Sequence, residues 1–129
     1  MELRKSTKAD LKITKEFAPQ ITSEVGRHTL VIDDKPMGIF KLKVTDTALE
    51  ILEFNMSYEA GGHVMPFVKL LFDTYKKPNI ICCPLTRFQG LWSMTEPRYE
   101  EDGSSLVNHK TFFSAYERMK PMLKSHGVI

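Results

Sequence analysis

The sequence has little cysteine, and the cysteine it has cannot form an ordinary disulfide. Its two cysteines, Cys82 and Cys83, are adjacent within an apolar run, which excludes a disulfide-stapled extracellular scaffold. We expect both to be buried structural thiols, because free cysteine is among the most buried residue types. A nucleophilic role would need a nearby cation that lowers the thiol pKa, and the sequence indicates none.

Long apolar runs and strong charge are also missing. No segment approaches the ~20 apolar residues that cross a bilayer, and no secretory pattern opens the chain. The 18 basic and 16 acidic residues give a net charge of only +2, so attraction to a polyanion is not indicated. We therefore expect a cytoplasmic protein that binds neither membrane nor nucleic acid.

Metal-binding spacing and repeats are absent as well. His28, His63, His109 and His126 lack the pairing with each other or with cysteine that zinc sites show, so no metal site is expected. There is no internal repeat and no linker. The 129 residues are therefore expected to form one domain, residues 1–129.

The most informative segment present runs from Asn55 to Tyr75. An apolar strand, Leu49–Met56, leads into a glycine-containing loop at residues 57–63 and then into an amphipathic helix. One face of this helix carries Val64, Phe67, Val68, Leu71, Phe72 and Tyr75. A glycine turn at a helix start presents backbone N–H groups at the positive end of the helix dipole, so the sequence predicts an anion site there.

The rest of the pattern predicts a mixed α+β fold. Residues 1–5, 29–32, 37–44 and 49–56 are expected to be strands, and the last three form an antiparallel meander. Asn79–Cys83 is a continuous apolar run typical of a strand buried on both faces. Together with Leu49–Met56 and the helix between them, it predicts a βαβ unit.

Other segments receive less specific predictions. Thr7 and Asp10 have the spacing of a capping box, which starts a helix that we expect to reach about Phe17. Residues 21–27 are a helical turn or a loop, residues 87–95 are expected to be helical, and residues 100–105 an exposed loop. Residues 111–116 fit a helix or an aromatic strand, and this alternative stays open.

This order of elements resembles the GNAT superfamily of acetyl-CoA-dependent N-acetyltransferases. The stretches that carry the resemblance are Leu3–Leu11, Leu30–Gly38, Glu50–Met56, Tyr58–His63 and Arg98–Gly103. In the family, the loop after the fourth strand holds the pyrophosphate. Its pattern fits Tyr58, Gly61 and His63 in one frame, or Ser57, Ala60 and Gly62 in another.

The resemblance implies acetyl transfer from acetyl-CoA to a small-molecule or peptide amine. It implies cofactor contacts from the strand end, the loop and the helix start, namely Phe54, Met56, Gly61, Gly62, His63 and Val64. A carboxylate on the strand would accept the amine proton. Glu53 is favoured over Glu50, which projects to the opposite face, and Tyr99 would protonate the departing thiolate.

Each of these residues also has an ordinary structural interpretation. Glu53 would be a solvated strand residue, Tyr99 a half-buried aromatic, and the glycines a plain turn with positive φ. His63 would cap the helix or bond locally. Two other functions therefore stay open: a non-catalytic domain of the same fold, suggested by the acidic Glu59 in the loop, or an unrelated α+β interaction protein. A homodimer is a further open alternative.

Overall fold

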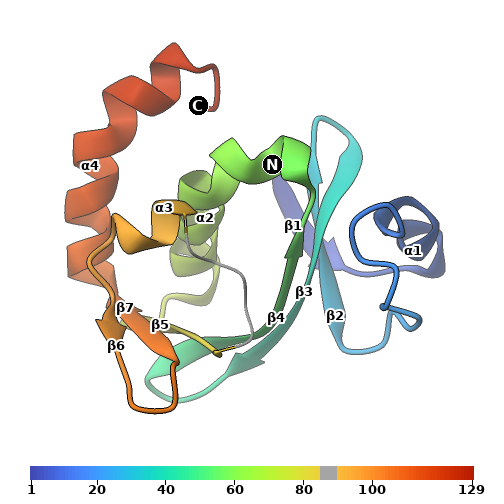
Figure 1. Cartoon of the computed structure of the whole chain (residues 1–129), viewed down its shortest axis with the longest axis horizontal. Coiled ribbons are helices and arrows are strands. Elements are labelled where there is room, and N and C mark those ends of the chain that lie inside the picture. The colour runs from blue at the N-terminus through green and yellow to red at the C-terminus, as the bar shows by residue number, and fades with distance from the viewer. Residues whose placement is uncertain (85–89) are drawn as a thin grey trace.

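The computed structural model describes residues 1–84 and 90–129, and a seven-stranded mixed sheet runs through it (Figure 1). The strands lie in the order β1-β2-β3-β4-β5-β7-β6. The elements in chain order are β1 (Glu2–Lys5), α1 (Lys8–Thr14), β2 (Arg27–Ile32), β3 (Lys35–Val44), β4 (Ala48–Met56), the 3₁₀-helix η1 (Tyr58–His63), α2 (Val64–Tyr75), β5 (Asn79–Cys82), α3 (Gly90–Ser93), β6 (Arg98–Tyr99), β7 (Ser105–Asn108) and α4 (His109–Ser125). The predicted mixed α+β fold is confirmed.

The antiparallel meander forms as the alternating pattern predicted. Strands β1 to β4 pair consecutively and antiparallel. The turn between β2 and β3 places Asp33 and Asp34 at φ values of 50° and 63°. Two successive residues with positive φ are typical of the tight hairpin turns whose twist matches that of the flanking strands.

The βαβ unit is also confirmed. β4 continues through η1 into α2, and the chain returns to β5, which pairs parallel to β4. α2 buries Met65, Phe67, Val68, Leu71 and Phe72. The helix ends at Lys76, whose left-handed φ of 53° stops the helical ladder two residues before Pro78.

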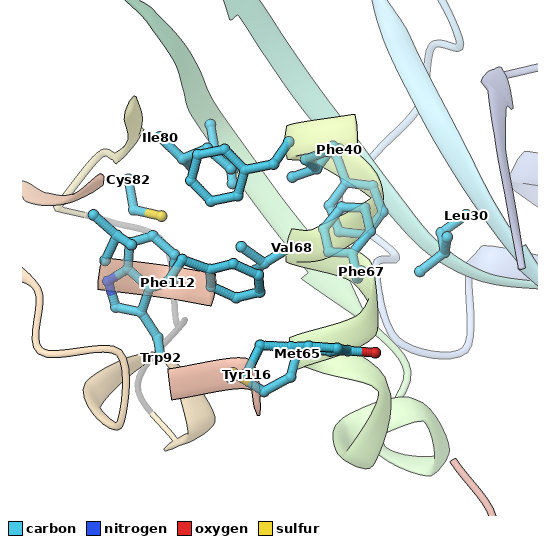
Figure 2. Close-up of a cluster of buried hydrophobic side chains, with 14 of the residues drawn as sticks. Leu30, Phe40, Met65, Phe67, Val68, Ile80, Cys82, Trp92, Phe112 and Tyr116 are labelled. Atoms are coloured by element: carbon cyan, nitrogen blue, oxygen red, sulfur yellow. The ribbon is translucent and has the colours of Figure 1, made fainter. Parts of the chain in front are cut away.

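The two faces of the sheet are covered unequally. α1 packs over β3 on one face, where Ile39 meets Ala18 and Ile21 in a small buried cluster. α2, α3 and α4 lie on the other face (Figure 1). The main core is here, and Figure 2 shows Phe40, Phe67, Val68, Ile80, Phe112 and Tyr116 within it. Stacking of Phe40 on Phe67, with ring centroids 4.4 Å apart, ties β3 to α2.

A buried carboxylate fixes the start of α1. The Asp10 side chain accepts hydrogen bonds from the Arg4 guanidinium at 2.6 and 2.9 Å, from the Thr7 backbone N–H at 2.8 Å and from the Thr29 hydroxyl at 3.0 Å. Thr7 in turn accepts from the Asp10 N–H, so the predicted capping box is present. The hydrogen bonds from Arg4 are the main cause that lowers the pKa of Asp10 to about 2.

Several boundary predictions were wrong. α1 ends at Thr14 and not near Phe17, because the chain turns there to reach the buried Ala18. Of the two alternatives left open for residues 21–27, the loop is the one present, and it ends where Arg27 begins β2. The predicted loop at 100–105 holds a hairpin turn, but Ser105 is buried and begins β7, which pairs with β5.

The open alternative in the tail resolves to a helix. α4 buries Phe112, Ala115, Tyr116 and Leu123, at helical spacing, so the helix predicted for this segment is correct and the strand is not. The helix predicted for residues 87–95 is present as α3 over Gly90–Ser93. Residues 87–89 of that prediction lie outside the described residues.

Candidate active site at the open edge of β4

The candidate site begins with an irregularity in β4. The register pairs Lys41 with Glu53 but Leu42 with Ile51, so Leu52 is an extra residue, as in a β-bulge. β4 pairs with β5 only from Ala48 to Ile51, and the Cys83 N–H donates to the Ile51 carbonyl 3.1 Å away where the pairing ends. Beyond the bulge, β4 continues from residue 52 to 56, and its pairing with β5 in the described part of the chain does not extend there.

In this part of β4, the backbone N–H and C=O groups of alternate residues point toward β3 or away from it. The Ser57 N–H donates to the Met37 carbonyl at 2.8 Å, and Asn55 lies opposite Ile39. Since alternate residues of a strand turn their N–H and C=O groups to opposite sides, Met56 turns its backbone polar groups away from β3, toward the edge that β5 leaves. Phe54 has the same orientation, and its ring packs on Phe40 and Phe67.

The segment after β4 is a helical turn and not an open glycine loop. Residues 58–63 form η1, and Gly61 and Gly62 are not among the glycines with positive φ. The expectation that these glycines serve a turn with positive φ was therefore wrong. A 3₁₀-helix pairs each N–H with a carbonyl three residues earlier, as the Ala60 N–H does with Ser57 at 2.9 Å. The positive end of the helix dipole consequently lies at residues 57–59.

The glycines at this turn leave room at the surface. A Cβ built on Gly61 has no heavy atom within 4 Å, and one built on Gly62 lies 3.4 Å from the Val128 Cγ2 atom. Glu59 lies in the first turn with its side chain exposed, and the Lys35 ammonium is 3.9 Å from its carboxylate. Lys35 therefore provides positive charge beside the acidic residue that the sequence places in the turn.

Glu53, the predicted base, is held by an arginine that the sequence analysis did not single out. The Arg27 Nε and Nη2 atoms donate to the two carboxylate oxygens at 2.8 and 3.1 Å, and both side chains are partly buried. Arg27 also donates to the Ser23 carbonyl at 2.8 Å. Both oxygens of Glu53 thus accept charge-assisted hydrogen bonds from Arg27.

Tyr99, the predicted acid, lies far from Glu53. Tyr99 is on β6, which pairs only with β7 in the described chain, and three strand steps separate β6 from β4. At ~4.8 Å per step, this corresponds to roughly 14 Å. The Tyr99 side chain is exposed. The structure therefore does not bring the two predicted catalytic residues together, and a catalytic role for either stays a prediction.

His63 and Val64 mark the junction of η1 and α2. His63 occupies the N-cap position of α2 but makes no side-chain capping hydrogen bond, so the local capping role was not found. Its Nδ1 atom is buried and has no hydrogen-bond partner among the described residues. Val64 is half-buried and packs against the main core, which indicates a structural role for its side chain.

The prediction of a buried structural thiol is confirmed for Cys82. It is buried in the main core, and burial is the main cause that raises the pKa of its thiol. Cys83 is half-buried, and its pKa is also raised, first by burial and then by the charges of Glu50 and Asp102. Neither thiol is therefore activated as a thiolate near neutral pH.

The comparisons with solved structures decide the fold. A protein provisionally assigned as an acetyltransferase superposes with a TM-score of 0.60 over 94% of this chain and 92% of its own, at 12% identity. A protein from Bacteroides thetaiotaomicron, provisionally assigned to the GNAT family, gives 0.56 over 95% and 96%, also at 12% identity. The chain has the GNAT fold.

A third structural neighbour was solved with coenzyme A. N-acetylglutamate synthase from Neisseria gonorrhoeae, complexed with coenzyme A and N-acetyl-glutamate, superposes with a TM-score of 0.52 over 91% of this chain at 14% identity. The chain spans about a third of that protein's length, since the match covers 32% of it. No family model and no curated protein matches the sequence.

The GNAT fold excludes one of the alternatives left open by the sequence, and it does not test the non-catalytic domain or the homodimer. An unrelated α+β interaction protein was one of the open alternatives, and the fold match rules out an unrelated fold. Among the described residues, no helix is long and apolar enough to cross a membrane.

Sequence reasoning missed three residues that shape the site: Leu52, Arg27 and Val128. The extra residue at Leu52 left no local signal, because bulges depend on the pairing strand. Arg27 lies 26 positions from Glu53, so their pairing depends on the register of three strands. Val128, whose Cγ2 atom lies 3.4 Å from where a Cβ on Gly62 would be, comes near the turn only through the packing of α4.

Proposed function

We propose that this domain binds the thioester of an acyl-coenzyme A, with acetyl-CoA as the leading candidate, at the Met56 end of β4, on the side that faces away from β3. It would transfer the acyl group to an amine. The observation that carries this proposal is that the parallel pairing of β4 with β5 ends at Ile51 while β4 continues to Met56, beside the entry turn of a helix. The GNAT fold supports the same class of reaction.

The residues present fit an extended ligand that carries both amides and phosphates. Met56 turns its backbone N–H and C=O groups toward the edge, where an amide chain can add hydrogen bonds in the manner of a strand. At residues 57–59 the start of η1 offers the positive end of a helix dipole to phosphate. The absence of a side chain at Gly61, where a Cβ would have no neighbour within 4 Å, lets the ligand approach the backbone.

The chemical contribution of the protein is chiefly positioning. Acetyl-CoA would supply an activated carbonyl carbon, and transfer to the amine nitrogen breaks its carbon–sulfur bond. Holding the amine and the thioester in contact replaces an encounter in solution by a local reaction. Glu53, paired with Arg27, is the carboxylate that we propose as the acceptor of the amine proton.

One observation favours a second candidate, a binding domain without catalysis. The carboxylate oxygens of Glu53 are both engaged by Arg27, and Tyr99 lies three strands away. In this case the edge of β4 would hold the coenzyme, and no described residue would supply the acid for the departing thiolate.

A thermal shift assay tests the proposal. A ligand that binds only the folded state stabilises it by about 2.7 kcal/mol at 100 times its Kd. For a domain of this size that corresponds to a rise in Tm of roughly 8–15 °C. We expect such a rise with millimolar acetyl-CoA and with coenzyme A, and a smaller rise with equal concentrations of inorganic pyrophosphate, which has only the phosphate part of the ligand. Unchanged Tm values with both coenzymes would contradict the proposal.

A thiol-release assay then separates the two candidates. The protein is incubated with acetyl-CoA and a panel of small amines and amino-terminal peptides, and free coenzyme A is measured. Release that depends on an added amine supports transfer. A Tm rise without release from any amine supports the non-catalytic domain.

A further inference from the structure

A cavity of about 350 Å³ lies between α1 and the segment that leads from α1 back to β2. One wall comes from α1, and the other comes from residues 19–24 of this returning segment. Both walls lie on the sheet face opposite to α2, α3 and α4 (Figure 1). The described residues that line the cavity include none from β4, η1 or α2, so the cavity is separate from the proposed coenzyme site.

The floor of this cavity is apolar. Leu11 of α1 and Ile21 of the returning segment line it, and both pack in the small cluster that contains Ile39. Ile21 is buried and Leu11 is half-buried. Pro19 adds a ring without a backbone N–H. Such a floor favours a ligand with a hydrocarbon or aromatic body, because burial of that body supplies most of the favourable free energy of binding.

The rim of the cavity carries an excess of positive charge. Lys8, Lys12 and Lys15 line it from one face of α1, at the i, i+4, i+7 spacing. All three are exposed, and none forms an ion pair with another residue in the described part of the chain. Glu24 is the one carboxylate among the described lining residues. Like charges at i, i+4 destabilise a helix, so the lysines are unfavourable for α1 unless an anion lies between them.

The wall formed by the returning segment is fixed without a ligand. The Ile21 N–H donates to the Ala18 carbonyl at 3.2 Å, and the Arg27 N–H donates to the Glu24 carbonyl at 3.2 Å. The Arg27 guanidinium also donates to the Ser23 carbonyl at 2.8 Å. A ligand that enters a preformed cavity has little ordering of the chain to offset, so more of the burial and charge pairing contributes to affinity.

We propose that this cavity binds a small apolar carboxylic acid. The apolar body of the acid lies on Leu11 and Ile21, and its carboxylate pairs with the ammonium groups of α1. The same chemistry is present in a free acid and in a peptide that combines acidic and apolar residues. A free acid is favoured, because the cavity volume is at the lower end of the range for small-molecule sites. The proposal does not depend on coenzyme binding.

Titration of the whole chain with octanoate, followed by the amide resonances in NMR, tests the proposal. We expect shifts concentrated in residues 8–24. Acetate has the carboxylate without the apolar body, and octylammonium has the same chain with the opposite charge, so each should bind at least about tenfold more weakly. No shift at millimolar octanoate, shifts centred on another segment, or equal binding of octylammonium would overturn the proposal.

A peptide in which leucine and glutamate alternate distinguishes the two sources of the acid. It should bind more weakly than octanoate, because only one of its side-chain pairs fits the cavity. Tighter binding of the peptide would overturn the assignment to a free acid.

A pair of double variants tests the role of the lysines. Lys12→Gln with Lys15→Gln removes two charges from the rim, and Lys110→Gln with Lys124→Gln removes two from exposed positions on α4. Octanoate should bind about five- to tenfold more weakly to the first variant and nearly as well as wild type to the second. The first variant should keep at least the wild-type Tm, since repulsion on α1 is reduced. Equal affinity of both variants for octanoate would overturn the role of the α1 lysines.

Discussion

At the scale of single residues, the side chains with the most defined surroundings are held by charge pairs. Asp10 accepts four hydrogen bonds from Arg4, Thr7 and Thr29 while only 3% exposed. Both carboxylate oxygens of Glu53 accept hydrogen bonds from the Arg27 guanidinium. The sequence predicted the Asp10 cap from its spacing to Thr7, since that contact is local. It could not predict the partner of Glu53, which lies two strands away.

The buried Asp10 network leads to a pH-dependent stability. Its folded-state pKa of about 2 lies below the ordinary value of 3.8, so it stabilises the fold above the ordinary pKa, and this contribution is lost as the pH falls from about 4 to about 2. Asp10→Asn should lower the free energy of unfolding by about 2 kcal/mol at neutral pH, and the difference from wild type should shrink in that acidic range. Urea denaturation at neutral pH and at about pH 2 measures both.

Asp73→Asn is the control for this measurement. Asp73 pairs with Lys69 at 2.6 Å but is half-exposed, and such surface pairs contribute less than about 1 kcal/mol. Equal destabilisation by Asp10→Asn and Asp73→Asn at neutral pH would refute the account of Asp10, as would an Asp10→Asn effect that does not change with pH.

At the scale of elements, the strands and the long helix follow from local periodicity, and the exceptions arise where tertiary contacts decide. The stripe of Val64, Phe67, Val68 and Leu71 predicted α2 correctly. The four-residue β7 was missed because Ser105–Asn108 is too short for its alternation to stand out, and it forms by pairing with β5. η1 was read as a loop from its glycines, but the buried Ala60 anchors it as a helical turn.

The open edge of β4 makes a prediction at the scale of the strand. Met56→Pro removes the N–H that points to this edge, and a proline is tolerated in a strand where the lost N–H faces no paired neighbour. The fold should therefore be retained, with the same far-ultraviolet circular dichroism, while affinity for acetyl-CoA falls by at least about tenfold. Isothermal titration measures the affinity.

Met56→Ala controls for the loss of the side chain, which is half-buried against the core. It keeps the backbone N–H, so its affinity should stay close to that of the wild-type chain. If Met56→Pro binds as well as Met56→Ala, the backbone of this edge takes no part in the site.

At the scale of the whole molecule, the GNAT fold was predicted from the order of elements and is confirmed by structures that share 12–14% of the sequence. The site was predicted less completely. The place of the loop between β4 and α2 was correct, but its glycines adopt a helical turn, and Glu53 and Tyr99 are separated. Fold depends on patterns of burial, whereas the pairing of individual polar side chains depends on register and on packing that a single sequence does not encode locally.

The central claim is that the open edge of β4 and the entry turn of α2 form one coenzyme site. Hydrogen exchange measured with and without saturating acetyl-CoA tests it most directly, because it locates the ligand on the chain. We predict protection concentrated in residues 52–63, with little change in β1, β2 and α1. Protection confined to any other segment, or no change in exchange at millimolar acetyl-CoA, would contradict the account.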